Sequence, residues 1–287
     1  MNDDRFFKPF EAQEVNHCGP TSLGMCLGIL GIYADQRDLA RAAGKPWRVY
    51  ATGLDEQDLK KAAAKYGVMC EYVSETDRRK GQGFVRRLAT HLNAGNPLVL
   101  LTLDFNHWVA VIGRAKERFI IFDPLDDEHA FSRWNERTLI RKSWNETDDD
   151  EPDAYFAILT SRKDGKPARW NPTEAFLDLC EKGSEEAAET MANDLMEMAG
   201  RAATSGPKGR TALLADILAE EKSAIVDSVV HWTASDAVDD DDIEELYDDY
   251  TVIAGAAGIR VPASTSRSAL VAQVTTVLAA FAWNDEL

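Results

Sequence analysis

The pattern of apolar and polar positions predicts helices through the first third of the chain. Within residues 18–31, Leu23, Cys26, Leu27 and Leu30 recur at the three- and four-residue spacing of one helical face. Further helices are expected over residues 35–43, 54–66 and 84–94. Their ends carry residues typical of helix boundaries, such as an Asp before the first turn and a Gly after the last.

The pattern then changes to short β-branched or apolar runs that are separated by turns. Such runs predict strands, here over residues 97–103, 108–114, 118–122 and 155–160. Helices followed by an antiparallel sheet give the α+β class, with the helices packed on the sheet in a domain of about 160 residues.

A polar stretch rich in turn-forming residues follows at positions 161–167. Helical patterns resume beyond it, over residues 173–182, 184–199, 211–232, 241–257 and 266–281. No repeat of fixed period is visible, which favours a helical bundle over a solenoid. We therefore expect two domains, residues 1–162 and an all-α domain of residues 170–287.

Composition places the 287-residue chain among globular proteins, with 45% hydrophobic and 28% charged residues. The formal net charge of -17 argues against a nucleic-acid partner, because a phosphate backbone would be repelled. A peptide substrate or protein partner that carries basic residues would instead be attracted.

The sequence also bears on location and cofactors. The acidic start lacks the basic flank and apolar core of a signal peptide, and no run is long enough to span a bilayer. Four cysteines do not make a dense disulfide framework in a chain of this length. Zinc-binding spacings and glycine-rich phosphate loops are absent from the sequence. We expect a cytoplasmic protein with no membrane partner, no metal and no organic cofactor.

Four residues supply the parts that acyl transfer through a thiol requires. Cys18 lies at a predicted helix N-terminus, where the helix dipole and unpaired amides favour the thiolate. His107 opens a predicted strand and could reach Cys18 across a cleft to form a thiolate–imidazolium pair. Asp123 ends the next strand of the hairpin and can orient His107. Gln13 can offer its side-chain amide to an oxyanion beside the Cys18 amide.

Each of these residues also has a purely structural interpretation. A cysteine at a helix start, a histidine at a strand end, an Asp-Pro turn and a single glutamine are all common without catalysis. Their joint occurrence in this order favours the catalytic interpretation. Two neighbours are ambiguous: His17 could tune the thiol, and Trp108 could line a substrate groove or pack in the core.

The motifs resemble those of the bacteriocin-processing (double-glycine leader) peptidases and their stand-alone relatives in the papain-like clan. The resemblance rests on Gln13 ahead of Cys18-Gly-Pro-Thr-Ser, on His107-Trp-Val-Ala-Val-Ile-Gly and on Asp123-Pro124, and it extends over residues 6–160. It implies a papain-like fold in which Cys18 is the nucleophile and His107 the general base. Asp123 would orient His107, and Gln13 would be the oxyanion donor.

The chain departs from the transporter-linked members of that group in two places. His17 precedes the cysteine where those members commonly have Asp, and Gln13 stands five residues before Cys18, one closer than in those members. It also contains no fused ABC transporter. The resemblance therefore implies cysteine chemistry without fixing cleavage after a double glycine.

The sequence thus predicts a cysteine peptidase that acts on a protein or peptide substrate, with the C-terminal helices as a candidate surface for target selection or for another protein partner. Two alternatives remain open at this point. The same site could deamidate, transamidate or cleave an isopeptide bond in a protein partner, because a thioester does not dictate its acceptor. The domain could also be a non-catalytic binding module, although such a module has no need for intact Cys18, His107 and Asp123.

Overall fold

The computed structural model describes residues 13–32, 34–115, 117–125, 131–146, 152–165, 211–233, 240–256, 259–263 and 265–284. The chain divides into two compact units, one comprising Lys8–Asn171 and the other made mainly of Pro172–Leu287. The predicted boundary between residues 162 and 170 stays a prediction, and the helices predicted over 173–182 and 184–199 lie outside the described residues.

The helices of the first unit confirm the predicted ones and add short ones. They are α1 (Cys18–Ile29), α2 (Gln36–Ala43), α3 (Val49–Thr52), α4 (Glu56–Lys65), α5 (Gly81–Asn93) and α6 (Glu136–Ser143), with a 3-10 turn, η1 (Arg78–Lys80). Side-chain caps explain several starts: Asp35 accepts a hydrogen bond from the Asp38 amide, and Asp55 forms a capping box with Asp58. Helices α3 and α6 were not predicted.

Helix α5 begins three residues earlier than predicted, because Gly81 belongs to the helix and not to a loop. A β-carbon at Gly81 would lie 2.6 Å from the Tyr155 hydroxyl oxygen and 3.0 Å from Ile140. Glycine is therefore required there by close packing against distant residues, and this requirement is invisible in the local pattern.

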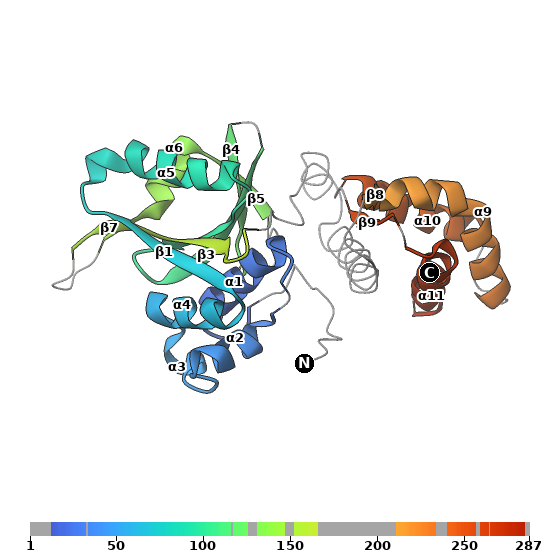
Figure 1. The fold of residues 1–287 in the computed structure, drawn as a ribbon, viewed down its shortest axis with the longest axis horizontal. Helices are drawn as coiled ribbons and strands as arrows, with labels where there is room; N and C mark the ends of the chain where they lie inside the picture. The colour runs from blue at the N-terminus through green and yellow to red at the C-terminus, as the bar shows by residue number, and fades with distance from the viewer. Residues whose placement is uncertain are drawn as a thin grey trace. The chain divides into compact units, whose positions relative to one another are not determined.

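An antiparallel sheet forms the centre of the described part of this unit. Its strands are β1 (Val68–Glu75), β2 (Leu98–Thr102), β3 (His107–Ala115), β4 (Arg118–Phe122), β5 (Phe131–Asn135), β6 (Trp144–Asn145) and β7 (Ala154–Arg162). The order is β1-β7-β2-β3-β4-β5, and β6 pairs with β7. Helices α5 and α6 cover one face and α1 to α4 lie on the other (Figure 1). The predicted α+β class is confirmed.

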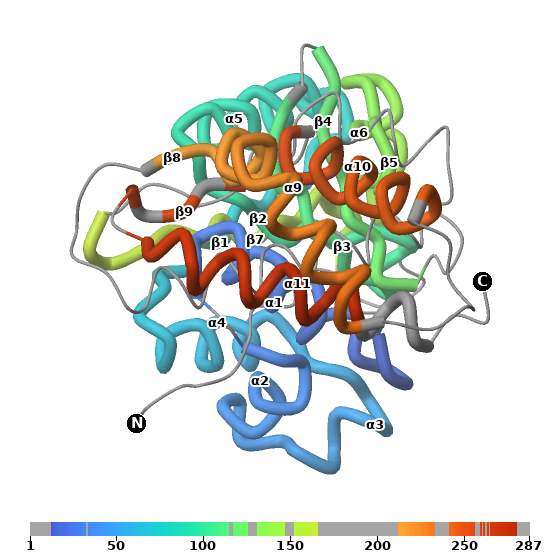
Figure 2. The backbone as a smooth tube through the Cα atoms, turned by 90° about the vertical axis from the view of Figure 1, so that its right-hand side faces the viewer, coloured from blue at the N-terminus to red at the C-terminus, as the bar shows by residue number. Residues whose placement is uncertain are grey.

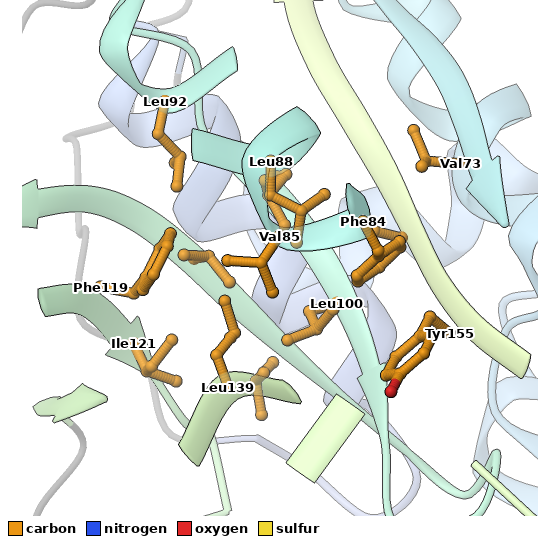
Figure 3. Close-up of a cluster of buried hydrophobic side chains, with 14 of the residues drawn as sticks. Val73, Phe84, Val85, Leu88, Leu92, Leu100, Phe119, Ile121, Leu139 and Tyr155 are labelled. Atoms are coloured by element: carbon orange, nitrogen blue, oxygen red, sulfur yellow. The ribbon is translucent and has the colours of Figure 1, made fainter. Parts of the chain in front are cut away.

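The two faces of the sheet are packed differently. Under α5 and α6, a cluster that includes Phe84, Leu88, Phe119, Leu139 and Tyr155 is almost completely buried (Figure 3). On the other face, α1 contacts β2 and β3 from one side and α2 and α4 from the other. All residues of α1 except Cys18 and Gly24 are buried, so this helix is enclosed all round and not amphipathic as predicted.

The second unit is helical in its described part. It contains α9 (Leu214–Thr233), α10 (Asp240–Ala256) and α11 (Arg267–Asn284), visible in Figure 2. A short antiparallel pair, β8 (Thr211–Leu213) and β9 (Arg260–Pro262), adds to the predicted all-α pattern. Tyr247 and Tyr250 fill its core. Of the helices described in either unit, none combines the length and apolar character needed to cross a membrane.

Candidate active site

Cys18 is the first residue of α1, and its side chain is partly exposed. The first turn of the helix lies tightly against its neighbours. A β-carbon at Gly19 would come within 3.2 Å of the Trp108 ring and 3.3 Å of Leu59. The small residue after Cys18 therefore allows the helix N-terminus to approach β3, the strand that begins at His107.

His107 and Asp123 are brought together by the β3–β4 hairpin. His107 is the first residue of β3, and Asp123 follows directly after β4, whose last residue, Phe122, pairs with Ala110. The Nε2 atom of His107 lies 2.7 Å from Oδ1 of Asp123. The same carboxylate oxygen accepts a hydrogen bond of 3.1 Å from the Leu125 amide, which fixes the carboxylate in place.

The electrostatics of this group depend on competing effects. Burial alone would lower the pKa of His107, but hydrogen bonds and charge interactions with Asp123 and Cys18 outweigh it and raise the pKa to about 9. Burial would raise the pKa of Asp123, but the hydrogen bond and charge of His107 bring this pKa below its ordinary value. At neutral pH the imidazolium of His107 and the carboxylate of Asp123 therefore form an ion pair.

Gln13 lies beside the segment that carries Asp123. Its main-chain amide donates a hydrogen bond of 3.1 Å to the Pro124 carbonyl. The side-chain oxygen Oε1 is buried and has no hydrogen-bond partner among the residues that the structure describes. The unused atom is an acceptor and can accept a hydrogen bond from an incoming ligand, whereas an oxyanion would need the Nε2 donors of the same amide.

The loop that leads to Cys18 is anchored on α2 and α3, an arrangement that the sequence did not reveal. The Glu14 amide donates to the side chain of Gln36 at 2.8 Å, and the Glu14 carboxylate accepts a bond of 2.6 Å from the Tyr50 hydroxyl and pairs with Arg37. Asn16 donates from Nδ2 to the Tyr50 carbonyl at 2.7 Å. These contacts hold residues 13–17 in one conformation.

His17 is fully buried in this loop. Its Nδ1 lies 2.7 Å from the Val15 carbonyl, and its ring makes an edge contact with Tyr50 at 4.5 Å between centroids. Both observed contacts tie His17 to the loop and to α3. Of the two possibilities, these contacts support a structural role for His17 over tuning of the thiol.

A second residue that the sequence analysis missed is Ser22. Its hydroxyl donates a hydrogen bond of 2.9 Å to the main-chain carbonyl of Trp108, and both groups are buried. The position four residues after Cys18 places Ser22 on the same side of the helix, which is the signal that could have identified it. Trp108 itself is 7% exposed and packs against Phe156, so it belongs to the core and does not line a groove.

A cavity of about 160 Å³ lies against the loop before Cys18. It is lined by His17, Arg37, Arg41, Pro46, Trp47 and Tyr50. The Trp47 side chain is 83% exposed, which is unusual for a residue of this size and apolar character. The cavity therefore offers aromatic surface next to the residue that precedes the thiol.

The other described cysteines are poor nucleophiles. Burial raises the pKa of the Cys26 thiol far above its ordinary range and that of Cys70 to about 11. Cys180 lies outside the described residues. Across the described ranges, no group of three or more His, Cys, Asp or Glu side chains is arranged to hold a metal ion.

Comparisons with known proteins give a family match and several similar solved structures. Residues 7–151 match the model of the Peptidase_C39 like family. Comparison with curated proteins gives no match. Similar solved structures include a double glycine motif protease from an AMS/PCAT transporter in complex with the leader peptide, at 18% identity, covering 54% of this chain and 91% of that chain with a TM-score of 0.38.

Two further similar structures are peptidase domains of ComA. The domain from Streptococcus ComA, a bifunctional ABC transporter, is 17% identical, with 54% of this chain and 98% of that chain covered and a TM-score of 0.39. The domain from Streptococcus mutans ComA is 16% identical, with 54% and 99% covered and a TM-score of 0.32.

Proposed function

Because the chain belongs to the Peptidase_C39 like family and is a cysteine-type peptidase, we propose that Cys18, His107 and Asp123 are its catalytic triad and that Gln13 is its oxyanion donor. One observation carries this assignment. The His107 ring contacts the Asp123 carboxylate at 2.7 Å, and Cys18 lies near enough to help raise the pKa of the same ring, although the three residues lie far apart in the sequence.

The different uses of the two ring nitrogens of His107 support these roles. Asp123 occupies Nε2 of His107, which leaves Nδ1 to take the proton of the thiol. Proton transfer from Cys18 to Nδ1 gives the thiolate–imidazolium pair, and Asp123 stabilises the imidazolium and fixes the orientation of the ring. The raised pKa of His107 is consistent with a ring that stays protonated until the leaving group needs its proton.

The reaction then follows in two stages. The Cys18 thiolate attacks the peptide carbonyl carbon, and the Gln13 side-chain amide and the Cys18 main-chain amide stabilise the oxyanion. The carbon–nitrogen bond breaks as His107 gives its proton to the leaving amine, which leaves an acyl thioester on Cys18. Water attacks this thioester, His107 takes the proton of the water, and the carboxylic acid product leaves with the thiolate restored.

The substrate that suits this site is a flexible segment of a protein or peptide. The exposed Trp47 ring and the cavity beside His17 provide a surface for such a segment along the loop that leads to Cys18. Aromatic residues at such positions commonly contribute much of the binding free energy of a peptide. The departures at His17 and Gln13 leave the identity of the cleaved bond open.

We assign target recognition to the C-terminal unit on the basis of charge. Residues 172–287 contain 23 Asp and Glu but only 7 Lys and Arg, so they carry -16 of the net charge of -17. A basic protein substrate or partner would be attracted to this unit and held near the peptidase unit. A cytoplasmic location, expected from the sequence, stays a prediction.

The assignment is tested by labelling the protein with iodoacetamide near neutral pH and mapping the modified peptide by mass spectrometry. We expect modification at Cys18 and not at Cys26 or Cys70, and loss of fast labelling in the His107→Ala variant. Fast labelling of Cys26 with an inert Cys18 would contradict the proposal.

The reaction type is tested by trapping. A Cys18→Ala variant should retain a bound substrate that co-purifies and that the active protein cuts into two fragments. A gain of one mass unit on the trapped protein without fragmentation would indicate glutamine deamidation instead. Cleavage by the Cys18→Ala variant itself would contradict the assigned nucleophile.

A further inference from the structure

The turn that leads into His107 has an unfavourable backbone. Leu103, Asp104 and Phe105 have φ angles of 51°, 53° and 63°, so three successive residues with side chains adopt the left-handed region. This region is readily visited by glycine and disfavoured for leucine and phenylalanine. Such a conformation persists only where surrounding contacts enforce it, and it occurs often at functional sites.

One buried side chain links the turn to the elements around it. Asn145 is fully buried, and its Oδ1 accepts a hydrogen bond of 3.0 Å from the Phe105 amide. Its Nδ2 donates to the carbonyls of Leu101 at 3.3 Å, Ser143 at 3.0 Å and Ala154 at 3.2 Å. The amide thus ties the middle of the turn to the end of β2, the end of α6 and the start of β7.

Additional bonds close the turn on both sides. The Glu146 amide donates to Oδ1 of Asp104 at 3.1 Å, and the Asn106 amide donates to the Leu103 carbonyl at 3.1 Å. The Thr102 hydroxyl donates to the His107 carbonyl at 3.1 Å. Thr102 is the last residue of β2 and the strand partner of His107, so the turn that Asn145 holds connects the two residues of this pair.

We propose that Asn145 is a positioning residue for His107, whose imidazole contacts Asp123 and Cys18 only while the Asn145 amide holds the left-handed turn of residues 103–106. The proposal rests on the proposed function, because it assigns the turn a task in the peptidase site. The direction of a side chain follows from its backbone, and a misplacement of about 1 Å in a catalytic group can cost about 100-fold in rate. An amide is needed, since Asn145 both donates and accepts.

The first test compares Asn145→Asp with Ser143→Ala. Asn145→Asp keeps the size and an acceptor for the Phe105 amide but loses the donors to three carbonyls. Ser143→Ala removes a buried hydroxyl that donates within α6 to the Leu139 carbonyl at 2.7 Å and does not touch the turn. The measurements are the rate of Cys18 alkylation by iodoacetamide, the NMR titration of His107 and the thermal unfolding midpoint.

We expect Asn145→Asp to slow alkylation by about 100-fold at neutral pH and to lower the pKa of His107 towards its ordinary value. Ser143→Ala should lower the unfolding midpoint while both other measurements stay at wild-type values. A folded Asn145→Asp protein with unchanged alkylation and an unchanged His107 titration would overturn the proposal. If Cys18 of the wild type does not react, the proposed function itself is contradicted. Failure of the Asn145 proposal and failure of the proposed function can therefore be distinguished.

Two exposed positions test the turn without disturbing the core. Asp104→Ala removes the acceptor of the Glu146 amide from a solvent-exposed residue, and we expect slower alkylation with a preserved fold. Leu103→Gly replaces an exposed side chain in a conformation that glycine accepts freely, so it should restore part of the alkylation rate when added to Asn145→Ala. Restored unfolding temperature without restored alkylation, or full reactivity of Asp104→Ala, would overturn the proposal.

Discussion

The Ser22 hydroxyl donates a hydrogen bond of 2.9 Å to the main-chain carbonyl of Trp108, and this bond joins α1 to β3 within the core. Ser22 lies one turn after Cys18, and Trp108 directly follows His107. The spacing between the proposed nucleophile and its base is therefore set by a contact that involves neither of them.

Ser22→Ala should weaken both stability and activity. The Trp108 carbonyl would remain buried without its partner, which costs about 1–3 kcal/mol in the free energy of unfolding. Urea unfolding and the rate of Cys18 alkylation measure the two effects. Ser143→Ala is the control, since it removes a buried hydroxyl within one helix and should change stability alone. Wild-type alkylation in a destabilised Ser22→Ala protein would show that this bond does not set the spacing.

A matched pair of glycine substitutions tests the close approach of α1 to β3. Gly83 is also helical but has no atom within 4 Å of its absent β-carbon, so Gly83→Ala should stabilise the protein by about 0.5–1 kcal/mol. Gly19→Ala gains the same helix propensity, but the new β-carbon would press against Trp108 and Leu59. We therefore expect the free energy of unfolding to fall by about 1 kcal/mol. Equal stabilisation by both variants in urea unfolding would contradict the tight packing.

Asp123→Asn removes the charge that holds His107 protonated. We expect the pKa of His107 to fall from about 9 in an NMR titration and the rate of peptide cleavage to fall by about 100-fold or more. Asp153→Asn, on the same unit, serves as the control for loss of one negative charge. A cleavage rate within twofold of the wild type would contradict the role of Asp123.

The same ion pair predicts a pH dependence of stability. The folded pKa of His107, about 9, lies above its ordinary value of 6.5, so its stabilising contribution is complete below pH 6.5 and is lost as the pH rises through 9. The pKa of Asp123 is lowered, so its contribution is present above its ordinary value of 3.8 and is lost as the pH falls through the folded value. The stability difference between wild type and Asp123→Asn should therefore be greatest near pH 5–6, at about 1–3 kcal/mol. A difference that grows from pH 6 to pH 10 would contradict this assignment.

Trp47→Ala tests the surface beside the loop that leads to Cys18. Because the side chain is 83% exposed, its removal should change the free energy of unfolding by no more than about 0.5 kcal/mol. We expect KM for a cleaved peptide to rise several-fold while kcat stays the same. Trp232, 69% exposed on α9, gives the matched control, because Trp232→Ala should leave both constants unchanged. An unchanged KM in Trp47→Ala would place the substrate elsewhere.

Local patterns were enough to predict much of this fold. The apolar runs of β2, β3 and β4 mark strands wherever they occur in a chain, and the Cys18 and His107 segments carry their chemistry in contiguous motifs. These features depend on neighbours in sequence. Elements as short as α3 and β6 were missed because they contain too few residues to show a period.

The contacts that set the geometry of the site depend instead on distant residues. Ser22 and Trp108 are 86 positions apart, and Asn145 and Phe105 are 40 apart. Nothing in the neighbourhood of a serine or an asparagine indicates which carbonyl it will meet. The same limit applies to Gly81 in α5. Position 81 requires glycine because Tyr155, on the distant strand β7, packs against it.

The enclosure of α1 on all sides has a consequence for how the enzyme loses its activity on heating. A thiol mounted on a surface helix can lose its alignment by local fraying, long before the rest of the protein melts. Here the helix can move only if the sheet, α2 and α4 separate from it. Heat inactivation should therefore coincide with cooperative melting of the first unit, and protein in which this unit is partly denatured should have no peptidase activity.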